Sequence, residues 1–433
     1  MKLNWFSPLP PAKSGIAECT AGLLPTLTKH AHVTLWTDQR EYDSELDRHC
    51  LVRQFDPKRM NWPIVNEADV TFYNMGNNHL FHASIWQVSR VHPGVVILHD
   101  VSLHNFFDSL YNGVWRDTAG YLDQMTTHYG VEGREAAHQF AKQGTLNIEV
   151  MAERYPLTPL ALENALAAIV HSPGAFDQLQ SQNQIAVAYI PLPAVFGSRP
   201  NIEELPKRKL GPPYNLIMFG HLGRNRRLDA VLEALAGFSQ RQLFHLDIYG
   251  SSNDPKFLRE RIRSLKLSEA VTLHGYAAER ELDEALKKAH LAINLRYPTM
   301  GEASASQLRI WSYALPSFVT RVGWYSSLSE ETVAHIRPDR EVDDIQAQLS
   351  SFLSTPERFE QMGRSGYDAL LKKHDPEVYA RTILEISENA QQLHMRAVAK
   401  ELARRAGQLV ASWSNDSTES VRIAEQIVAL TGD

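Results

Sequence analysis

The chain has 433 residues, 43% of them hydrophobic and 22% charged, and its formal net charge is −6. This length suits two domains of roughly 200 residues each, with cores large enough to need no disulfide bonds. The acidic balance excludes the broad basic face of a nucleic-acid-binding protein, and the presence of only two cysteines, Cys19 and Cys50, indicates a reducing compartment.

The first half of the chain alternates short apolar or β-branched runs, which are typical of buried strands, with stretches of helical spacing. Strands are predicted at residues 2–5, 33–37, 70–73, 95–98, 167–170 and 186–190. A proline-rich loop at 7–15 precedes a predicted helix at 16–29. Helix formers and aromatic residues dominate after the strand at 95–98, so we expect a helical insertion over residues 102–155.

A segment with six prolines and interspersed charges, residues 191–213, is typical of an interdomain linker. Beyond it, strands are predicted at 216–219, 243–249, 271–273, 291–294 and 317–320. Helices are predicted between them at 228–237, 257–265, 281–288 and 304–313, and the pattern from 356 to 433 is helical throughout.

Strands that alternate with helices of about 10–15 residues predict parallel βαβ units. We therefore expect an α/β fold with two Rossmann-like, doubly wound domains facing a central cleft. The predicted boundaries are residues 1–195 for the first domain, 196–213 for the linker, 214–385 for the second domain, and 386–433 for C-terminal helices that pack back on the first domain.

The N-terminus lacks the apolar stretch of a signal peptide, and the sequence contains no run of about 18 apolar residues. We therefore expect a cytoplasmic protein. Peripheral contact with the inner face of a membrane stays open, because Lys400, Arg404 and Arg405 give the C-terminal helices a charged face. A solvated helix surface is the simpler explanation of that face.

Four common fingerprints are absent from the sequence: G-x-G-x-x-G, the P-loop, closely spaced Cys/His zinc ligands and the G-x-S-x-G elbow. Their absence argues against a nicotinamide dehydrogenase, a P-loop NTPase, a zinc site and an α/β-hydrolase. Ligands of open parallel sheets bind beyond the carboxyl ends of the strands. The loops after the predicted strands are therefore the candidate sites.

The loop at residues 219–227 joins a predicted strand to a helix and combines glycines with Arg224, Arg226 and Arg227. Glycines let a backbone approach a phosphate closely, and arginines bind a diphosphate through charge-assisted hydrogen bonds. The alternative is a solvated basic turn in front of a surface helix.

Two further loops carry polar side chains. Residues 296–306 open a helix with small residues and hydroxyls, which suit an anion, and Glu302 suits sugar hydroxyls; an N-capping segment is the alternative. His99 and Asp100 directly follow the strand at 95–98, where a histidine can bind a substrate hydroxyl. A buried, hydrogen-bonded histidine is the alternative there.

Together these segments resemble motifs of the retaining family 4 glycosyltransferases, which have the GT-B fold. Residues 219–227 resemble the loop G-R-L-x-x-x-K-G, and residues 297–323 resemble the segment E-G-F-G-x-x-x-x-E-A-x-A-x-G-x-P-V-I. Residues 7–17 are similar to the N-terminal glycine loop of the family, and His99 matches its strand-end histidine. The resemblance spans residues 3–385. The segment M-G-E-x-S-A-S at residues 300–306 is similar to variants of this motif in bacterial polysaccharide enzymes of the family.

The resemblance implies roles in binding the donor sugar and its diphosphate. The implied catalytic residues are His99, Glu302 and Arg226. The implied substrate-binding residues are Gly15, Asp100, Gly220, His221, Arg224, Ser304, Ala305 and Ser306.

This sequence departs from the family pattern at several positions. His221 stands where arginine is usual, and Arg227 stands where glycine is usual. Arg309 occupies the position of the second glutamate, which normally holds the nucleotide ribose. Glu302 precedes Arg309 by seven positions, one fewer than in the family. Recognition of the ribose and of the base is therefore left open.

The resemblance implies a retaining hexosyltransferase that moves a sugar from a nucleoside-diphosphate sugar to a saccharide or lipid-linked acceptor, in bacterial surface polysaccharide or glycan synthesis. We expect no cofactor and no metal, because no Asp-x-Asp motif is present and arginines with a helix N-terminus can stabilise the leaving diphosphate. The alternatives are a nucleotide-sugar epimerase of the same fold, a non-catalytic nucleotide-sugar-binding protein, and an α/β protein whose loops are purely structural.

Overall fold

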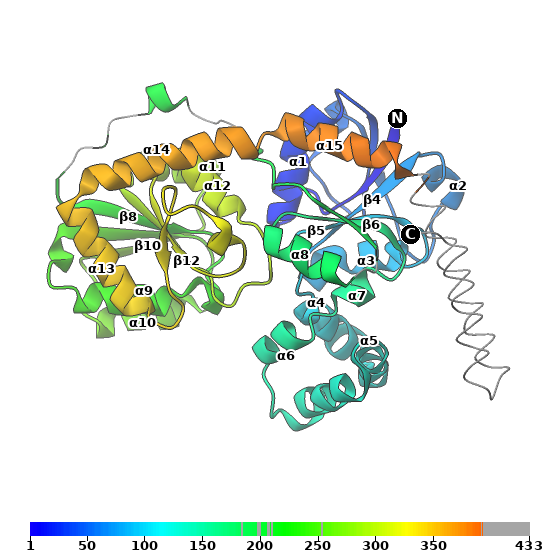
Figure 1. Ribbon diagram of the computed structural model, residues 1–433, viewed down its shortest axis with the longest axis horizontal. Coiled ribbons are helices and arrows are strands. Elements are labelled where there is room, and N and C mark those ends of the chain that lie inside the picture. The colour runs from blue at the N-terminus through cyan, green and yellow to red at the C-terminus, as the bar shows by residue number, and fades with distance from the viewer. Residues whose placement is uncertain are drawn as a thin grey trace.

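The computed structural model describes residues 1–182, 185–196, 201–205, 208, 211–252, 254–390 and 392. Two sheets, of seven and six strands, form the centres of two domains that lie next to each other (Figure 1). Neighbouring strands in both sheets run parallel. The predicted pair of Rossmann-like, doubly wound domains is therefore confirmed.

The first sheet has the strand order β3-β2-β1-β4-β5-β6-β7. Its strands are β1 (Lys2–Phe6), β2 (His32–Thr37), β3 (Leu51–Gln54), β4 (Val70–Met75), β5 (Gly94–Leu98), β6 (Ala165–Val170) and β7 (Ala186–Tyr189). The connecting helices are α1 (Gly15–Leu27), η1 (Ser44–Arg48), α2 (Trp62–Val65), α3 (His79–Ser89) and α8 (Pro173–Ser181). Every residue of β5 is buried, because helices cover both faces of the sheet.

Alternate residues of β5 belong to two different cores, as the pleat of a strand requires. Val95 and Ile97 pack with residues of α1, whereas Val96 and Leu98 pack with α3 and with the helices inserted after β5. The sequence of β5, apolar throughout, thus fits a central strand covered on both faces. Its carboxyl end is held at the middle of the sheet edge.

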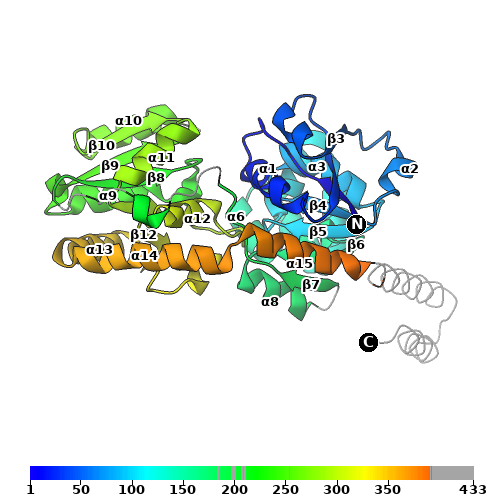
Figure 2. The same ribbon diagram turned by 90° about the horizontal axis from the view of Figure 1, so that it is seen from above.

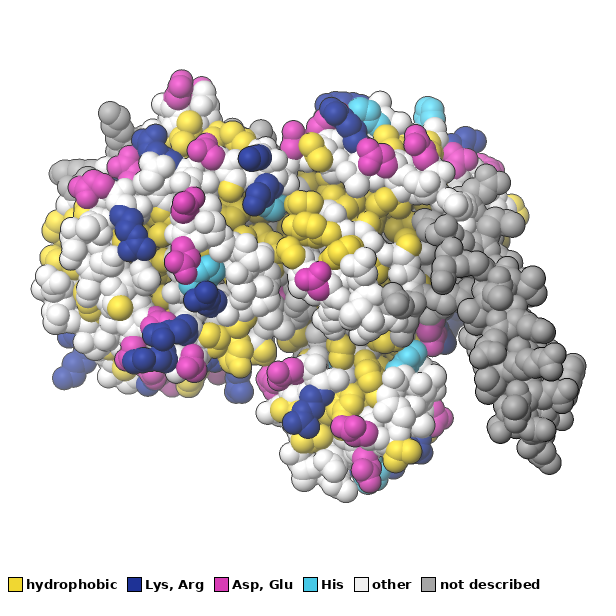
Figure 3. Space-filling view, viewed as in Figure 1, with side chains coloured by type: hydrophobic (Ala, Val, Ile, Leu, Met, Phe, Trp, Pro, Cys, Tyr) yellow, Lys and Arg dark blue, Asp and Glu magenta, His cyan; other side chains and the backbone are white. Residues whose placement is uncertain are grey.

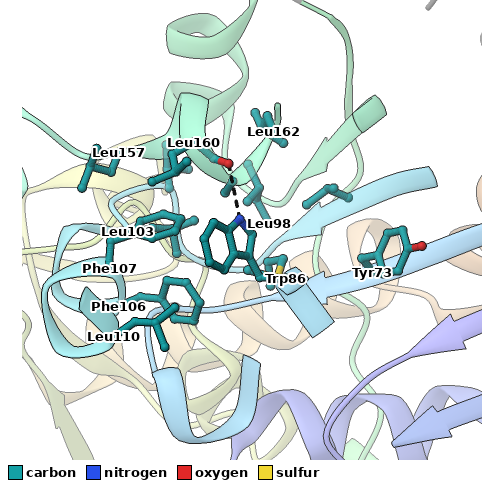
Figure 4. Close-up of a cluster of buried hydrophobic side chains, with 14 of the residues drawn as sticks. Tyr73, Trp86, Leu98, Leu103, Phe106, Phe107, Leu110, Leu157, Leu160 and Leu162 are labelled. Carbon is teal, nitrogen blue, oxygen red and sulfur yellow. Dashed lines mark hydrogen bonds between the residues drawn. The ribbon is translucent and has the colours of Figure 1, made fainter. Parts of the chain in front are cut away.

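The insertion after β5 consists of helices, as predicted, and extends away from the two sheets in Figure 1. It comprises α4 (His104–Asp108), η2 (Ser109–Trp115), α5 (Thr118–His138), η3 (Gln139–Gln143), α6 (Ile148–Arg154) and α7 (Thr158–Ala161). Figure 4 shows Trp86 of α3 between Phe106 and Phe107 on one side and Leu160 on the other. The Trp86 indole N–H donates to the Leu160 carbonyl at 3.4 Å. The packing of Trp86 against these three side chains, together with the hydrogen bond, fixes the insertion to the first domain.

The second sheet has the order β10-β9-β8-β11-β12-β13. Its strands are β8 (Tyr214–Phe219), β9 (Phe244–Tyr249), β10 (Val271–Gly275), β11 (Leu291–Asn294), β12 (Ser317–Thr320) and β13 (Ala334–Ile336). Its helices are η4 (Ile202–Glu204), η5 (Arg224–Arg226), α9 (Leu228–Gly237), η6 (Arg241–Leu243), α10 (Pro255–Ser264), α11 (Glu279–Lys288), α12 (Ala305–Ser312), η7 (Gly323–Ser327), α13 (Glu341–Ser354) and α14 (Pro356–Lys373). Leu216 and Met218 of β8 pack with α9, α10 and α13, whereas Ile217 and Phe219 pack with α11 and α12.

The chain crosses between the domains twice, and the two crossings are hydrogen-bonded to each other. The Ala194 N–H donates to the His374 carbonyl at 2.8 Å, and His374 Nδ1 lies 2.7 Å from the Leu192 carbonyl oxygen. Beyond His374, α15 (Pro376–Glu388) continues the line of α14 over the first domain (Figure 2). Tyr379 and Ile383 of α15 are buried in the core that contains α1.

The expected domain boundary at residue 385 falls within α15. Of the expected C-terminal helices at 386–433, only residues 386–390 and 392 are described, so Lys400, Arg404 and Arg405 lie outside the described residues.

In the described part of the chain, no helix combines the length and the apolar character that crossing a bilayer requires. Basic and acidic side chains are interspersed over the face seen in Figure 3.

Most predicted elements were confirmed within a few residues, and the helix 228–237 and the strands 291–294 and 317–320 agree in both bounds. Two strands, β3 and β13, were not predicted. β3 is an edge strand with partly or fully exposed side chains, and β13 has only three residues. Neither presents the continuous apolar run by which buried strands are recognised.

Candidate active site

His99 lies directly after β5, at the edge of the first sheet that faces the second domain. Its Nε2 is 3.0 Å from Asn74 Oδ1, while the amide nitrogen of Asn74 donates to the Phe6 carbonyl. That arrangement makes Asn74 Oδ1 the acceptor and His99 Nε2 the donor. Burial and the neighbouring rings of His171 and His82 lower the pKa of His99 well below its usual 6.5, so the imidazole is neutral.

Asp100 follows His99 in the chain and places a carboxyl group at the same strand end. Its Oδ2 accepts the Asn77 N–H at 2.7 Å. Burial and the nearby Glu302 carboxylate raise the pKa of Asp100 to about 7, against the opposing effects of Asn77 and Arg296. Near neutral pH this carboxyl can therefore either donate a hydrogen bond to a ligand or accept one.

Gly15 is the first residue of α1, and Ser14 caps the helix by accepting the Ile16 N–H at 3.3 Å. A Cβ at Gly15 would have no neighbour within 4 Å, so the helix N-terminus opens onto free space. Gly76 links this end to the strand-end acid, since a Cβ there would lie 2.6 Å from the Ile16 side chain and 3.2 Å from Asp100 Oδ2. Gly15 is thus on the same side of the first domain as His99 and Asp100.

In the second domain, Gly220 and Gly250 follow β8 and β9 and touch through their backbones. Their φ angles are 108° and 135°, and a Cβ on Gly250 would lie 1.8 Å from the Gly220 carbonyl oxygen. Glycine is therefore required at Gly250 by the close approach of two loops. The side chains nearest a Cβ on Gly220 are Arg226 at 3.9 Å and Ser306 at 4.0 Å.

Arg226 is buried beneath this glycine loop. It donates from Nη1 to Asn294 Oδ1 at 3.0 Å and from Nη2 to the Phe219 carbonyl at 2.8 Å. Burial and the charge of Arg296 lower its pKa to about 10, so the guanidinium stays charged at neutral pH. Two of its nitrogens thus hold the loop together, and its charge lies under the loop expected to receive the diphosphate.

The other arginines of the loop lie elsewhere. Arg224 is exposed, as is His221, and within the described residues the Arg224 guanidinium has no hydrogen-bond or ion-pair partner. Arg227 forms an ion pair with Glu341 at 2.6 Å, away from Gly220. Its φ of 57° lies in the left-handed region, which glycine adopts without strain. The expected three-arginine clamp is therefore not assembled, because Arg227 is paired with Glu341.

Glu302 is buried, and both of its carboxylate oxygens are engaged within its own loop. Oε1 accepts from Arg296 at 2.7 Å, and Oε2 accepts from the Thr299 hydroxyl at 2.9 Å and the Met300 N–H at 2.6 Å. Gly301, at φ 82°, turns the chain so that the carboxylate folds back over the preceding residues. Glu302 therefore shapes the loop, and a sugar hydroxyl would have to share its oxygens.

The N-terminus of α12 follows this loop. Ser304 caps the helix by accepting the Gln307 N–H at 3.1 Å. Ala305 is exposed and Ser306 is half-buried next to Gly220, so the first turn of α12 faces the glycine loop. Arg309 on the same helix is paired with Asp283 of α11 at 2.6 Å. Arg309, where the resemblance implies a ribose-binding acid, is thus a cation neutralised by Asp283.

The two halves of the site touch each other directly. The Val101 and Ser102 N–H groups donate to the Met300 carbonyl at 2.8 and 3.0 Å, and the Ser172 hydroxyl donates to the Gly301 carbonyl at 3.0 Å. The loop after β5 in the first domain is therefore joined to the loop that carries Glu302 in the second. Asp100 thereby lies close enough to Arg296 and Glu302 to feel both of their charges.

Several residues of this site were not predicted: Asn74, Asn77, Asn294, Arg296 and Tyr325. Asn294 ends β11 and Arg296 follows it, so the rule that ligands bind beyond strand ends could have found both. Tyr325, whose neighbours include Arg226 and Arg296, lies in a short helix that no motif marks.

The second domain matches a known protein family: residues 202–369 fit the family model described as glycosyl transferases group 1. Among curated protein sequences, none matches the chain. Among solved structures, HepE from Anabaena in complex with UDP and glucose aligns over 90% of this chain and 100% of its own, with 14% identity and a TM-score of 0.61.

Two further structures are similar over the whole chain. WaaG, a glycosyltransferase involved in lipopolysaccharide biosynthesis, aligns over 88% of this chain and 99% of its own, with 14% identity and a TM-score of 0.58. Sucrose-phosphate synthase from Thermosynechococcus elongatus aligns over 91% and 99%, with 17% identity and a TM-score of 0.58. The chain thus has the GT-B fold of glycosyltransferases, and its second domain matches the model for glycosyl transferases group 1.

Proposed function

We propose that this protein is a retaining glycosyltransferase of the family 4 type, which transfers a hexose from a nucleoside-diphosphate sugar to a saccharide or lipid-linked acceptor. The group 1 match of the second domain and the GT-B fold support this proposal. HepE, which shares this fold, was solved with UDP and glucose, and these compounds indicate the class of donor to test first.

The observation that carries the proposal is the pairing of two different half-sites across the domain junction. On one side, the neutral imidazole of His99 and the carboxyl of Asp100 suit the hydroxyls of a sugar. On the other, Gly220, the charged Arg226 and the first turn of α12 suit a diphosphate. A nucleoside-diphosphate sugar is the ligand that has both groups.

In this proposal the developing charge of the leaving diphosphate is stabilised by Arg226 and the N-terminus of α12, without a metal ion. The acceptor approaches from the first domain and its helical insertion. We take the acceptor to be a polysaccharide or a glycolipid of bacterial surface glycan synthesis. The enzyme would then work at the inner face of the membrane.

The first test is a thermal-shift panel with UDP, GDP, ADP, dTDP and CMP, with and without Mg²⁺. A ligand at 100 times its dissociation constant stabilises the folded state by about 2.7 kcal/mol, so one nucleotide should raise the melting temperature clearly. The panel also tests the metal, since an equal shift without Mg²⁺ is expected.

The nucleotide found in this way selects the sugar donor, and NMR of the product then gives the anomeric configuration. A product with the configuration of the donor supports a retaining transferase. An altered nucleotide sugar formed without any acceptor would indicate an epimerase instead. Binding without turnover over a broad acceptor panel would favour the non-catalytic binding protein.

A further inference from the structure

Three glycines stand in a row at the carboxyl ends of the neighbouring strands β8, β9 and β10: Gly220, Gly250 and Gly275. Gly250 touches the Gly220 backbone, and its N–H donates to the Gly275 carbonyl at 2.6 Å. Neighbouring strands lie about 4.8 Å apart, so Gly275 is about 10 Å along the sheet edge from Gly220. The row therefore leads from the proposed diphosphate loop to the edge strand β10.

Tyr276 follows this row and presents an open aromatic ring. It is 73% exposed, more than any other aromatic residue in the described part of the chain. Lys13 Nζ lies 5.1 Å from the centroid of its ring. Because Lys13 belongs to the loop before α1, the face of this ring points across the domain junction toward the first domain. An exposed ring in that place can stack a nucleobase, since every base has a π face.

An acidic side chain lies beside Arg309, where the resemblance implies a ribose-binding acid. Glu279 is the first residue of α11, and its Oε1 lies 3.7 Å from Arg309 Nη2, beyond hydrogen-bonding distance. Asp283 binds Arg309 more closely, at 2.6 Å. The Glu279 side chain is 66% exposed, so its carboxylate oxygens are left to accept hydrogen bonds from hydroxyl groups.

Glu279 faces the first domain, as Tyr276 does. Burial raises the pKa of Glu18 of α1, and the charges of Arg309 and Glu279 act on that pKa in opposite directions, so the three groups lie near one another. Both ribbon views place α12, which carries Arg309, on the side of the second domain toward α1 (Figures 1 and 2). The aromatic ring and the carboxylate thus stand together at the cleft end of α11.

We propose that Tyr276 and Glu279 bind the nucleoside of the donor, with the base stacked on the Tyr276 ring and the ribose hydroxyls donating to Glu279. This inference rests on the proposed function. It assigns to α11 the ribose contact that the resemblance places on α12. Stacking tolerates any base, so Tyr276 contributes affinity, whereas Glu279 distinguishes ribose from 2′-deoxyribose.

The test is isothermal titration of the full chain with UDP, GDP and ADP and with the 2′-deoxy form of each. We expect Tyr276→Ala to lower the affinity for the nucleotide that binds by about ten- to a hundredfold, the usual effect of losing one stacked base. Tyr276→Phe keeps the ring and should bind like the wild type. The matched control is Phe257→Ala, which removes an exposed ring of α10 and should have no effect.

The role of Glu279 is tested by the preference for ribose. The wild type should bind the ribonucleotide at least about tenfold more tightly than its 2′-deoxy form, because a hydrogen bond to a charged acceptor is lost. In Glu279→Ala this preference should fall below about threefold, whereas the control Glu260→Ala, at an exposed position of α10, should keep it. Both Tyr276 and Glu279 are exposed, so the melting temperatures of the variants without nucleotide should match the wild type.

The outcomes separate this inference from the proposed function. If a nucleotide binds but Tyr276→Ala keeps the wild-type affinity, or Glu279→Ala keeps the ribose preference, the inference is overturned and the transferase proposal stands. Tighter binding of a 2′-deoxy form by the wild type would also overturn it. If none of these nucleotides binds, the proposed function falls, and this inference falls with it.

Discussion

Arg226 is a buried cation that already binds Asn294 and the Phe219 carbonyl, so its removal affects both the fold and the proposed chemistry. In Arg226→Ala, two acceptors lose their donor, at a cost of about 1–3 kcal/mol in the free energy of unfolding. Loss of one charge-stabilising donor typically lowers kcat by about 10²–10³. We expect both effects, measured by urea unfolding and by initial rates.

The conservative variant Arg226→Lys separates these two effects. It keeps the charge but cannot bind both acceptors, so part of the turnover should return while stability stays reduced. If Arg226→Ala kept wild-type turnover on a stable fold, Arg226 would have no part in catalysis.

Asp100 makes the stability of the protein depend on pH. Burial and Glu302 raise its pKa from 3.8 to about 7, so the folded chain binds more protons than the unfolded chain between these values. The free energy of unfolding therefore falls as pH rises through this window, by at most about 1.4 kcal/mol per pH unit from this group. Asp100→Asn removes the effect, so the variant should gain stability over the wild type from pH 5 to pH 8.

Urea unfolding at pH 5, 6.5 and 8 measures this difference. The exposed Asp38→Asn variant is the control and should follow the wild type at every pH. The depressed pKa of His99 gives a slope of opposite sign below pH 6.5, but it is present in both proteins and cancels in the difference. A difference between Asp100→Asn and the wild type that does not change with pH would contradict this account.

Arg227 combines an unfavourable backbone conformation with a favourable ion pair, and magnitudes decide which effect is larger. Glycine at this position would relieve about 1 kcal/mol of backbone strain at φ 57°. It would also leave Glu341, whose side chain is 5% exposed, without its cation, at about 3 kcal/mol. We expect Arg227→Gly to be destabilising overall by thermal unfolding, and Arg227→Gly/Glu341→Gln to recover most of the loss.

Among the elements, α15 stabilises a domain other than the one it follows in the chain. Ile383 is fully buried against the core of the first domain, so Ile383→Ala should cost about 2–5 kcal/mol there. Hydrogen exchange should increase in α1 more than in α9. Val378 on the same helix is 55% exposed, and Val378→Ala should change stability by less than about 0.5 kcal/mol. Equal effects of the two substitutions would refute the packing argument.

The elements that could be predicted from sequence are those whose burial leaves an uninterrupted apolar run. β5 and β11 are covered on both faces, so every residue is apolar or lies at a strand end. β3 and β13 lie at sheet edges and mix few apolar residues with polar or charged ones, so neither leaves an apolar run. The edge strands β7 and β10 begin with short apolar or β-branched runs and were predicted, so it is the missing run that hides β3 and β13.

At the scale of the whole molecule, the loop at Gly301 holds the two domains in contact. A Cβ there would lie 3.0 Å from Val101 Cβ, and the φ of 82° disfavours any residue but glycine. Gly301→Ala should therefore separate the half-sites. We expect a larger radius of gyration by X-ray scattering and lower turnover. Gly174→Ala, where a Cβ meets nothing within 4 Å, is the control, and an unchanged radius in Gly301→Ala would contradict the prediction.

The chain positions of the half-sites were predictable, whereas their partners were not. His99 and the glycine loop stand at strand ends, which sequence alone can locate. That Arg227 pairs with Glu341, and that Glu302 is held by Arg296, depends on which side chains the fold brings together across the domain. The contact of Val101 and Ser102 with Met300 joins segments about 200 residues apart, and no local pattern encodes it.

The two crossings at Ala194 and His374 are fastened to each other at one point. Any movement of one domain relative to the other therefore has to bend both crossings together, because sliding one crossing past the other would break both bonds. The doubled connection limits the directions in which the second domain can turn on the first, and so helps to keep groups on the two domains aligned.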